Sequence, residues 1–315
     1  MYTDYRNWQT TLDVPATNSF VFRDHLNGFD SNYRNNIFDL LQQKFDKVNV
    51  CYHNILTQRV HDNYPNLDLK FSSNLQEMLN FNHYDVPSKL RNIPANFTKF
   101  LCSFNGSLHI SRMLLISALY NFGWADGSTK NFIVDSNLLD GFIMSTCPDA
   151  ERFYRKFILT NDDVFNRSII NLKNYDNDSR FNHTSNIPNL EFYLKSSFIH
   201  IVSETMATSY QPFVTEKILY PILTKSLWLA YAAPTYHTHL EKYYGFKKFT
   251  IFNYSFDEEL NPVVRLVEML TSLAKFANLT PADWYDLYLM EKDVREFNFD
   301  HYMSKAFLRV LKKYE

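Results

Sequence analysis

The stretch that decides the fold is residues 198–252: FIHIVSETMATSYQPFVTEKILYPILTKSLWLAYAAPTYHTHLEKYYGFKKFTIF. Three apolar runs within it have the length and composition of buried strands, at 198–202, 227–232 and 248–252. Helical spacing follows Thr215, a natural N-cap, and a second amphipathic segment ends at Gly245. This alternation of strands and helices predicts a parallel sheet with crossover helices.

The carboxyl ends of these strands are the expected place for a ligand, because open parallel sheets bind ligands beyond those ends. Glu204 follows the first apolar run, and the next helix begins with Thr215, Glu216 and Lys217. We therefore expect these four residues to form a binding site.

Lys217 is the most informative of the four. A cation in the first turn of a helix opposes the helix dipole at a cost of about 0.3–1 kcal/mol. A bound anion removes the conflict, because free backbone N–H groups and the ammonium group then face the same charge. Pro221 cannot donate to the carbonyl of Lys217, so we also expect a kink close to this site. The alternative is a Lys217 side chain that extends to solvent beside Glu216.

Two segments resemble the donor-binding region of fucosyltransferase-like glycosyltransferases. The first contains Phe-Val-Thr-Glu-Lys at 213–217, then Pro221, an apolar strand, and Tyr-Gly-Phe-Lys-Lys-Phe at 244–249. The second contains Lys-Phe-Leu-Cys-Ser-Phe-Asn at 99–105, followed by Arg112. Together with their spacing, the segments cover a little over half of the chain. They are also similar to related viral and bacterial glycosyltransferase-like proteins.

The resemblance implies two Rossmann-like domains that face a cleft, as in GT-B enzymes, and inverting transfer of a sugar from a nucleotide-diphosphate donor. It implies donor contacts from Asn105, Arg112, Glu204, Tyr210, Phe213, Thr215, Glu216 and Lys217. Arg112 suits a bidentate contact to the diphosphate, and Glu216 suits hydroxyls of the ribose or the sugar. The alternatives are an ordinary surface role for Arg112, a helix-capping role for Glu204, and core packing for Tyr210 and Phe213.

An inverting transfer also needs a base that takes the proton of the acceptor. The resemblance places this base in the first domain, where Asp24 follows a short predicted strand at 20–22. Asp30 and Asp62 are alternative candidates for the base. All three carboxylates also suit turns and caps.

The acidic triplets favour chemistry without a metal or another cofactor. Asp176-Asn177-Asp178 is the one Asp-x-Asp triplet, and it lies in a polar stretch typical of a loop. Asp257-Glu258-Glu259 is a candidate by composition, but a solvated helix start is the preferred interpretation. Fixed cations and helix N-termini are the alternative to a metal for stabilising a diphosphate leaving group.

The sequence divides into three parts. Residues 1–94 form a predicted acceptor domain, which includes a strand at 48–52. Residues 95–255 form the predicted nucleotide-sugar domain, and residues 256–315 are helices expected to pack back on the domains. Thr280 predicts a helix start in the last part, with proline at the first helical position and aspartate in the first turn.

Composition limits the setting of the protein. The 315 residues carry a net charge of −2, which does not indicate a nucleic-acid binder. Three cysteines without paired spacing favour a reducing compartment. The sequence contains no apolar leader and no apolar run near the roughly 18 residues of a membrane span, so we expect a cytoplasmic protein. Abundant Phe, Tyr and Asn indicate AT-rich coding, which fits a viral or AT-rich microbial source.

The acceptor is left open among a glycan, a protein and a modified base of viral DNA. The near-neutral charge argues against a DNA duplex, because phosphate neutralisation drives such binding. The chain has Thr224-Lys225-Ser226 and Pro234-Thr235 where the family usually has glycines. A catalytically silent sugar-nucleotide-binding or structural protein with the same fold is therefore the alternative function.

Overall fold

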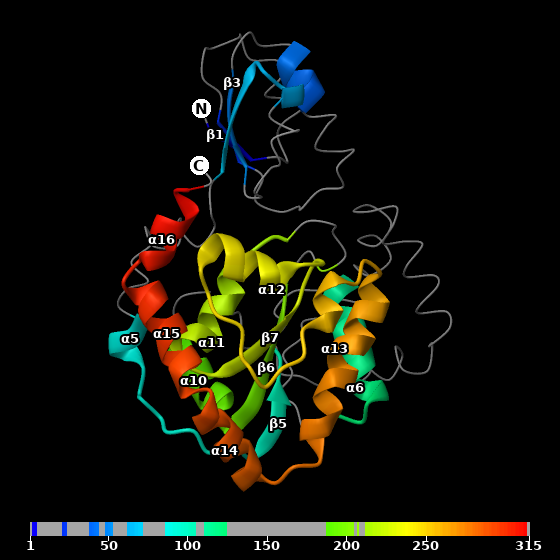
Figure 1. The fold of residues 1–315 in the computed structure, drawn as a ribbon, viewed down its shortest axis with the longest axis vertical. Coiled ribbons are helices and arrows are strands. Elements are labelled where there is room, and N and C mark those ends of the chain that lie inside the picture. The colour runs from blue at the N-terminus through cyan, green and yellow to red at the C-terminus, as the bar shows by residue number, and fades with distance from the viewer. Residues whose placement is uncertain are drawn as a thin grey trace.

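The computed structural model describes residues 2–4, 21–23, 38–43, 48–52, 62–71, 86–104, 110–124, 187–204, 207 and 212–313. These residues form a mixed α/β structure with two parallel sheets, a small one from the N-terminal part and a larger one surrounded by helices (Figure 1). The predicted α/β class, the parallel sheet and the helical C-terminal part are confirmed. The finer prediction of two Rossmann-like domains stays a prediction, as do the three domain boundaries.

The small sheet has the strand order β1-β2-β3-β4, and each neighbouring pair is parallel. Its strands are β1 (Tyr2–Asp4), β2 (Val21–Arg23), β3 (Val48–Tyr52) and β4 (Leu67–Phe71). β3 confirms the predicted strand at 48–52, whereas β1 and β4 have no counterpart in the sequence prediction. Residues 38–43 are helical, and Phe38 packs edge-on against Tyr64 with ring centroids 5.2 Å apart.

The larger sheet has β6 (Ser197–Ser203) at its centre, between β5 (Lys99–Cys102) and β7 (Leu227–Tyr231), and both pairs are parallel. Every residue of β6 and β7 is buried. A strand covered on both faces needs apolar side chains on both sides, which explains the continuous apolar runs. The predicted strands at 198–202 and 227–232 are confirmed.

The predicted strand at 248–252 is wrong, because this segment is irregular. Phe249 and Phe252 are buried in an aromatic cluster, which accounts for the apolar composition. The backbone amide of Phe249 donates to the Tyr254 hydroxyl at 3.1 Å, and that of Ile251 donates to Glu291 Oε1 at 2.7 Å. Side chains therefore satisfy amide groups that a neighbouring strand would otherwise satisfy.

Helices and helical turns precede, connect and follow the strands of the larger sheet. They are α5 (Val86–Lys89), α6 (Ile110–Asn121), α10 (Ile187–Ser196), the 3-10 turn η3 (Glu216–Ile218), α11 (Leu219–Leu223), α12 (Tyr236–His239) and the π-helix η4 (Leu240–Tyr244). Gly245 ends η4 in the left-handed region at a φ of 77°, which confirms the predicted helix end. Thr215 is the N-cap of η3, as predicted, and its side chain accepts from the Lys217 amide.

The C-terminal part contains the 3-10 turn η5 (Ser255–Glu258) and the helices α13 (Pro262–Ala277), α14 (Pro281–Met290), α15 (Lys292–Met303) and α16 (Ala306–Leu311). Thr280 and Asp283 form a capping box at the start of α14, which confirms the predicted helix start. Trp284 of α14 stacks on Phe198 of β6, with ring centroids 5.8 Å apart. The C-terminal helices and the larger sheet therefore share one hydrophobic core.

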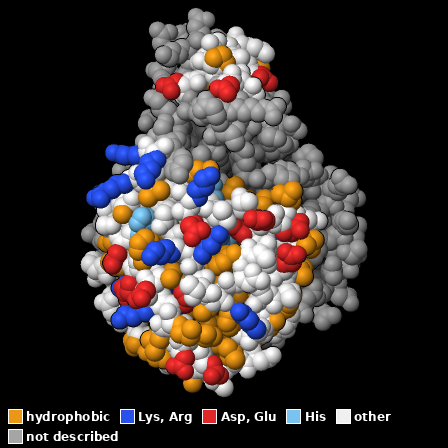
Figure 2. Space-filling model, viewed as in Figure 1, with side chains coloured by type: hydrophobic (Ala, Val, Ile, Leu, Met, Phe, Trp, Pro, Cys, Tyr) orange, Lys and Arg blue, Asp and Glu red, His pale blue; other side chains and the backbone are white. Residues whose placement is uncertain are grey.

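Charged side chains of both signs are interspersed on the face drawn in Figure 2. Basic side chains gather where α16 lies, and the exposed basic residues of α16 and its flanks are Lys305, Arg309, Lys312 and Lys313. We call these four residues the basic strip. Among the described residues, no helix is long and apolar enough to cross a membrane.

Candidate functional site

The site is built around Glu204, directly after β6 at the carboxyl edge of the larger sheet. The Glu204 amide donates to the Tyr231 carbonyl at 3.0 Å, which holds the residue beside the end of β7. Its side chain is buried, with 1% exposed. The carboxylate accepts from the Thr215 amide at 3.1 Å, the Thr215 hydroxyl at 2.5 Å and the Tyr236 hydroxyl at 2.6 Å. Three donors thus offset the cost of burying this charge, and Glu204 fixes the residue that begins η3.

Lys217 turns back toward this carboxylate. Its Nζ donates to Thr215 Oγ1 at 3.0 Å and lies 3.5 Å from Glu216 Oε1 and 3.9 Å from Glu204 Oε2. Only 13% of the Lys217 side chain is exposed. The alternative in which Lys217 extends to solvent is therefore wrong, and two carboxylates surround the cation at the helix start.

Arg112 enters the same region from the first turn of α6. The hydroxyl of Ser111 donates to the Glu204 carbonyl at 3.1 Å, which ties the start of α6 to the end of β6. Arg112 is 4% exposed, so it is not an ordinary surface arginine. Burial lowers the pKa of Arg112 to about 10, while the charges of Glu204 and Glu216 act in the opposite direction. Arg112 therefore stays charged at neutral pH within electrostatic reach of both carboxylates.

The hydroxyl of Tyr236 is a part of the site that the sequence analysis missed. Tyr236 is fully buried at the start of α12 and donates to Glu204 across 32 residues of sequence. Burial first, and then the charge of Glu204, hold the pKa of Tyr236 well above its ordinary value. The hydroxyl therefore stays protonated and acts as a donor. A single tyrosine that begins a helix gives no sequence signal for such a contact.

The remaining predicted site residues have different positions. Phe213 is 4% exposed and is part of the buried interior, in agreement with the core-packing alternative. Asp24, Asn105 and Tyr210 lie outside the described residues. The catalytic base and all of the donor contacts stay predictions.

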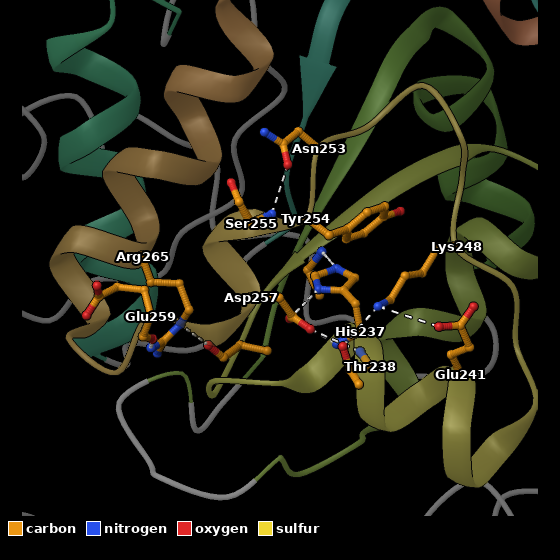
Figure 3. Close-up of polar contacts among 12 residues, drawn as sticks. His237, Thr238, Glu241, Lys248, Asn253, Tyr254, Ser255, Asp257, Glu259 and Arg265 are labelled. Carbon is orange, nitrogen blue, oxygen red and sulfur yellow. Dashed lines mark hydrogen bonds and ion pairs between the residues drawn. The ribbon is translucent and has the colours of Figure 1, made fainter.

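A buried histidine–aspartate pair lies after β7 (Figure 3). The Asp257 carboxylate accepts from the His237 amide at 3.1 Å, the Thr238 amide at 3.0 Å and His237 Nδ1 at 2.8 Å. The Ala230 amide donates to His237 Nε2 at 3.0 Å, so we assign the ring proton to Nδ1. The protein thus occupies both ring nitrogens, and the pair fixes the start of α12.

The expectation of a solvated helix start is wrong for Asp257, which is 2% exposed. Burial alone raises the pKa of its carboxyl, but the hydrogen bonds from the His237 ring, the His237 amide and the Thr238 amide outweigh burial and lower the pKa to about 2. Asp257 is therefore ionised at neutral pH and serves as a structural acceptor.

Arg265 of α13 is a second buried group that the sequence analysis missed. It is 2% exposed, and its guanidinium donates to the carbonyls of Ala232, Glu259 and Ala207. The Glu259 contact is drawn in Figure 3. These bonds hold the chain segments that leave β6 and β7, so Arg265 supports the carboxyl edge of the sheet.

The described residues contain no group of three or more His, Cys, Asp or Glu side chains that could hold a metal ion. A cavity of about 620 Å³ lies beside η5 and α13, and none of the predicted donor-binding residues lines it. In comparisons with protein-family models, curated proteins and solved structures, no match to this chain was found. The charged cluster of Arg112, Glu204, Glu216 and Lys217 is therefore the candidate binding site at the carboxyl edge of the sheet.

Proposed function

We propose that this chain is a metal-independent glycosyltransferase that binds a nucleotide-diphosphate sugar at the charged cluster. The observation that carries the proposal is the inward orientation of Lys217 and the burial of Arg112, which both interact with Glu204 and Glu216 at the carboxyl edge of a parallel sheet. That edge is where open parallel sheets bind ligands. Two cations that share the same carboxylates suit a leaving group with two phosphates.

The cluster supplies the electrostatic part of the reaction. Negative charge develops on the diphosphate as the sugar leaves, and Arg112 and Lys217 stabilise it. Glu204 keeps Thr215 in place through its two hydrogen bonds and so positions the Lys217 backbone. Glu216 Oε1 is 3.5 Å from Lys217 Nζ and forms an ion pair with it. When the diphosphate binds, Glu216 leaves this ion pair and accepts from a ribose or sugar hydroxyl of the nucleotide sugar. The base that completes an inverting transfer is Asp24 of the N-terminal part.

One surface feature bears on the acceptor class. The net charge of −2 gives no general attraction for DNA, but the local basic strip on α16 supports a negatively charged acceptor, such as viral DNA with a modified base. A screen of DNA, glycan and protein acceptors with one donor decides among the three, because sugar transfer is measured on each acceptor directly.

The proposal is tested by titration of the protein with UDP and GDP, followed by incubation with UDP- and GDP-sugars. A glycosyltransferase binds one of the two nucleotides, and it hydrolyses the matching sugar nucleotide slowly in the absence of an acceptor. If neither nucleotide binds in calorimetry, the donor assignment is overturned.

A catalytically silent protein is the second candidate, and one observation favours it. The two cations of the cluster already face two carboxylates, Glu204 and Glu216, so their charges cancel without a ligand. A buried network of this kind also serves fold specificity alone. Nucleotide binding without hydrolysis or transfer supports a silent sugar-nucleotide-binding module.

A further inference from the structure

Three cations gather at the opposite edge of the larger sheet, where β6 and β7 begin. Lys195 is in the last turn of α10, Lys225 lies just before β7, and Arg295 is part of α15. Figure 1 shows α10 and α14 toward the end of the sheet opposite α12, and α15 runs from α14 toward α16. This cluster is separate from the proposed donor site and does not depend on it.

Tyr288 of α14 contacts all three residues, Arg295 and Lys195 through their charged groups and Lys225 through its backbone carbonyl. The Arg295 guanidinium lies 3.4 Å from the centroid of the Tyr288 ring. The Tyr288 hydroxyl donates to the Lys225 carbonyl at 3.2 Å and accepts from Lys195 Nζ at 3.4 Å. The hydrogen-bond partner of the Lys195 amine is thus a neutral hydroxyl oxygen.

The surrounding carboxylates are used by other groups. Glu296 of α15 pairs with Lys225. Glu191 of α10 accepts from the backbone amides of Arg91 at 2.7 Å and Ile93 at 2.9 Å. Among the described residues, no carboxylate forms an ion pair with the half-buried Lys195.

The surroundings of Lys195 favour its neutral form. Burial is the largest cause, and the charges of Arg295 and Lys225 act in the same direction, whereas Glu191 and Glu296 oppose them. Together they lower the pKa of Lys195 to about 8. At pH 7 the neutral fraction of such an amine is roughly 300 times that of an ordinary lysine with a pKa of 10.5.

We propose that Lys195 is a modification site whose amine reacts with activated acyl groups, such as acyl phosphates, faster than the exposed lysines do. The nitrogen lone pair attacks the acyl carbon and a C–N bond forms. The bond from the acyl carbon to the phosphate oxygen breaks, phosphate leaves with the electron pair, and the amine proton passes to solvent. The product amide is neutral, so acylation also removes the repulsion between Lys195 and the two neighbouring cations.

The expected gain in rate is smaller than the gain in neutral amine, because nucleophilicity falls with basicity. With a Brønsted coefficient of about 0.5, as for thiols, a roughly 300-fold larger neutral fraction becomes a rate advantage of roughly tenfold. The full chain is treated with limiting acetyl phosphate between pH 6 and 10, and acetylation of each lysine is quantified by peptide mass spectrometry. Exposed Lys292 and Lys312 are the internal references.

We expect Lys195 to be acetylated roughly tenfold faster than both references at pH 7.5. The rate at Lys195 levels off with a midpoint near pH 8, whereas the rate at the two references keeps rising up to pH 10. Lys225→Met removes one neighbouring cation, so it raises the midpoint and slows labelling of Lys195 alone. Lys292→Met removes an exposed cation at the start of α15, so it is the matched control and leaves Lys195 unchanged. A rate at Lys195 equal to or below that of Lys312, or a midpoint near pH 10 in the unmodified chain, overturns the proposal.

Discussion

Lys217 occupies a position where its charge opposes the helix dipole, and two carboxylates explain why the sequence tolerates it. Glu216 and Glu204 lie 3.5 Å and 3.9 Å from its ammonium group. The cation is therefore compensated within the protein before any ligand arrives. An incoming diphosphate replaces these carboxylates as the negative partner of Lys217. The favourable free energy of diphosphate binding is therefore smaller than it would be for an uncompensated cation.

Asp257 permits a direct test of the buried pair that begins α12. Its pKa is about 2 in the folded protein, against an ordinary value of 3.8, so the unfolded chain binds more protons below about pH 4. The stabilisation by Asp257 is complete above that pH and is lost as the pH falls through about 2. We expect Asp257→Asn to lower the free energy of unfolding by about 2 kcal/mol at pH 7 and by much less at pH 2.5.

Urea unfolding at the two pH values measures this difference. Exposed Glu258→Gln is the matched control, and we expect it to change stability by less than about 0.5 kcal/mol. Equal destabilisation by Asp257→Asn at both pH values would show that the ionised carboxylate is not what holds α12.

Sequence reasoning at this scale succeeded where the contact is local. Thr215 and Thr280 were recognisable as caps because the groups that they cap lie two or three residues away. The pairs Asp257–His237 and Tyr236–Glu204 join residues 20 and 32 positions apart, so no local spacing reveals them. The composition of the acidic triplet at 257–259 predicted an exposed Asp257, because acidic residues usually lie at the surface, and this prediction is wrong.

At the scale of elements, the segment 248–252 shows what an apolar run cannot decide. A short apolar run fits a buried strand and an irregular buried segment equally well, because both exclude water. What distinguishes them is the presence of a neighbouring strand with free N–H and C=O groups. Here Tyr254 and Glu291 provide the partners instead.

Gly245 ends η4 and lies against α15 and α16. Substitutions at Gly245 therefore test how closely these helices approach η4. A Cβ atom at Gly245 would meet the His301 ring at 2.9 Å and Val310 at 3.1 Å, in addition to the strain of a positive φ. Gly123 has a similar φ of 70° and open space around it. We expect Gly245→Ala to destabilise the protein by about 1 kcal/mol more than Gly123→Ala does.

Denaturant midpoints of the two alanine variants isolate the contact, because the backbone strain is common to both. Equal losses of stability would mean that α15 and α16 do not pack against Gly245 as the structure describes.

At the scale of the whole molecule, strand and helix alternation was sufficient to predict a parallel sheet, whereas the site at its carboxyl edge stays a prediction. It did not predict that α14 covers β6, where Trp284 stacks on Phe198. Helices that follow a sheet in sequence can pack on either face or on another domain, and local periodicity carries no information about that choice.

This packing predicts that the last helices are required for folding. Residues 280–313 contribute Trp284, Tyr302, Phe307 and Leu311 to the core, and burial of each such side chain stabilises by roughly 1.5–3 kcal/mol. Their sum approaches the roughly 5–15 kcal/mol of a typical domain. We expect a chain that ends at residue 279 to show no cooperative thermal transition, whereas one that ends at Lys313 keeps it. A cooperative transition at an unchanged midpoint in the shorter chain would contradict this packing.

The central claim is that the inward-facing Lys217 binds a diphosphate, and calorimetric titration of Lys217→Ala with UDP and GDP tests it most directly. We expect the nucleotide that binds the unmodified chain to bind the variant roughly tenfold or more weakly, because one charged hydrogen bond is worth about 1.5–3 kcal/mol. Far-ultraviolet circular dichroism checks that the variant is folded, and exposed Lys312→Ala is the matched control with unchanged affinity. An unchanged dissociation constant for UDP and GDP in folded Lys217→Ala would contradict the account.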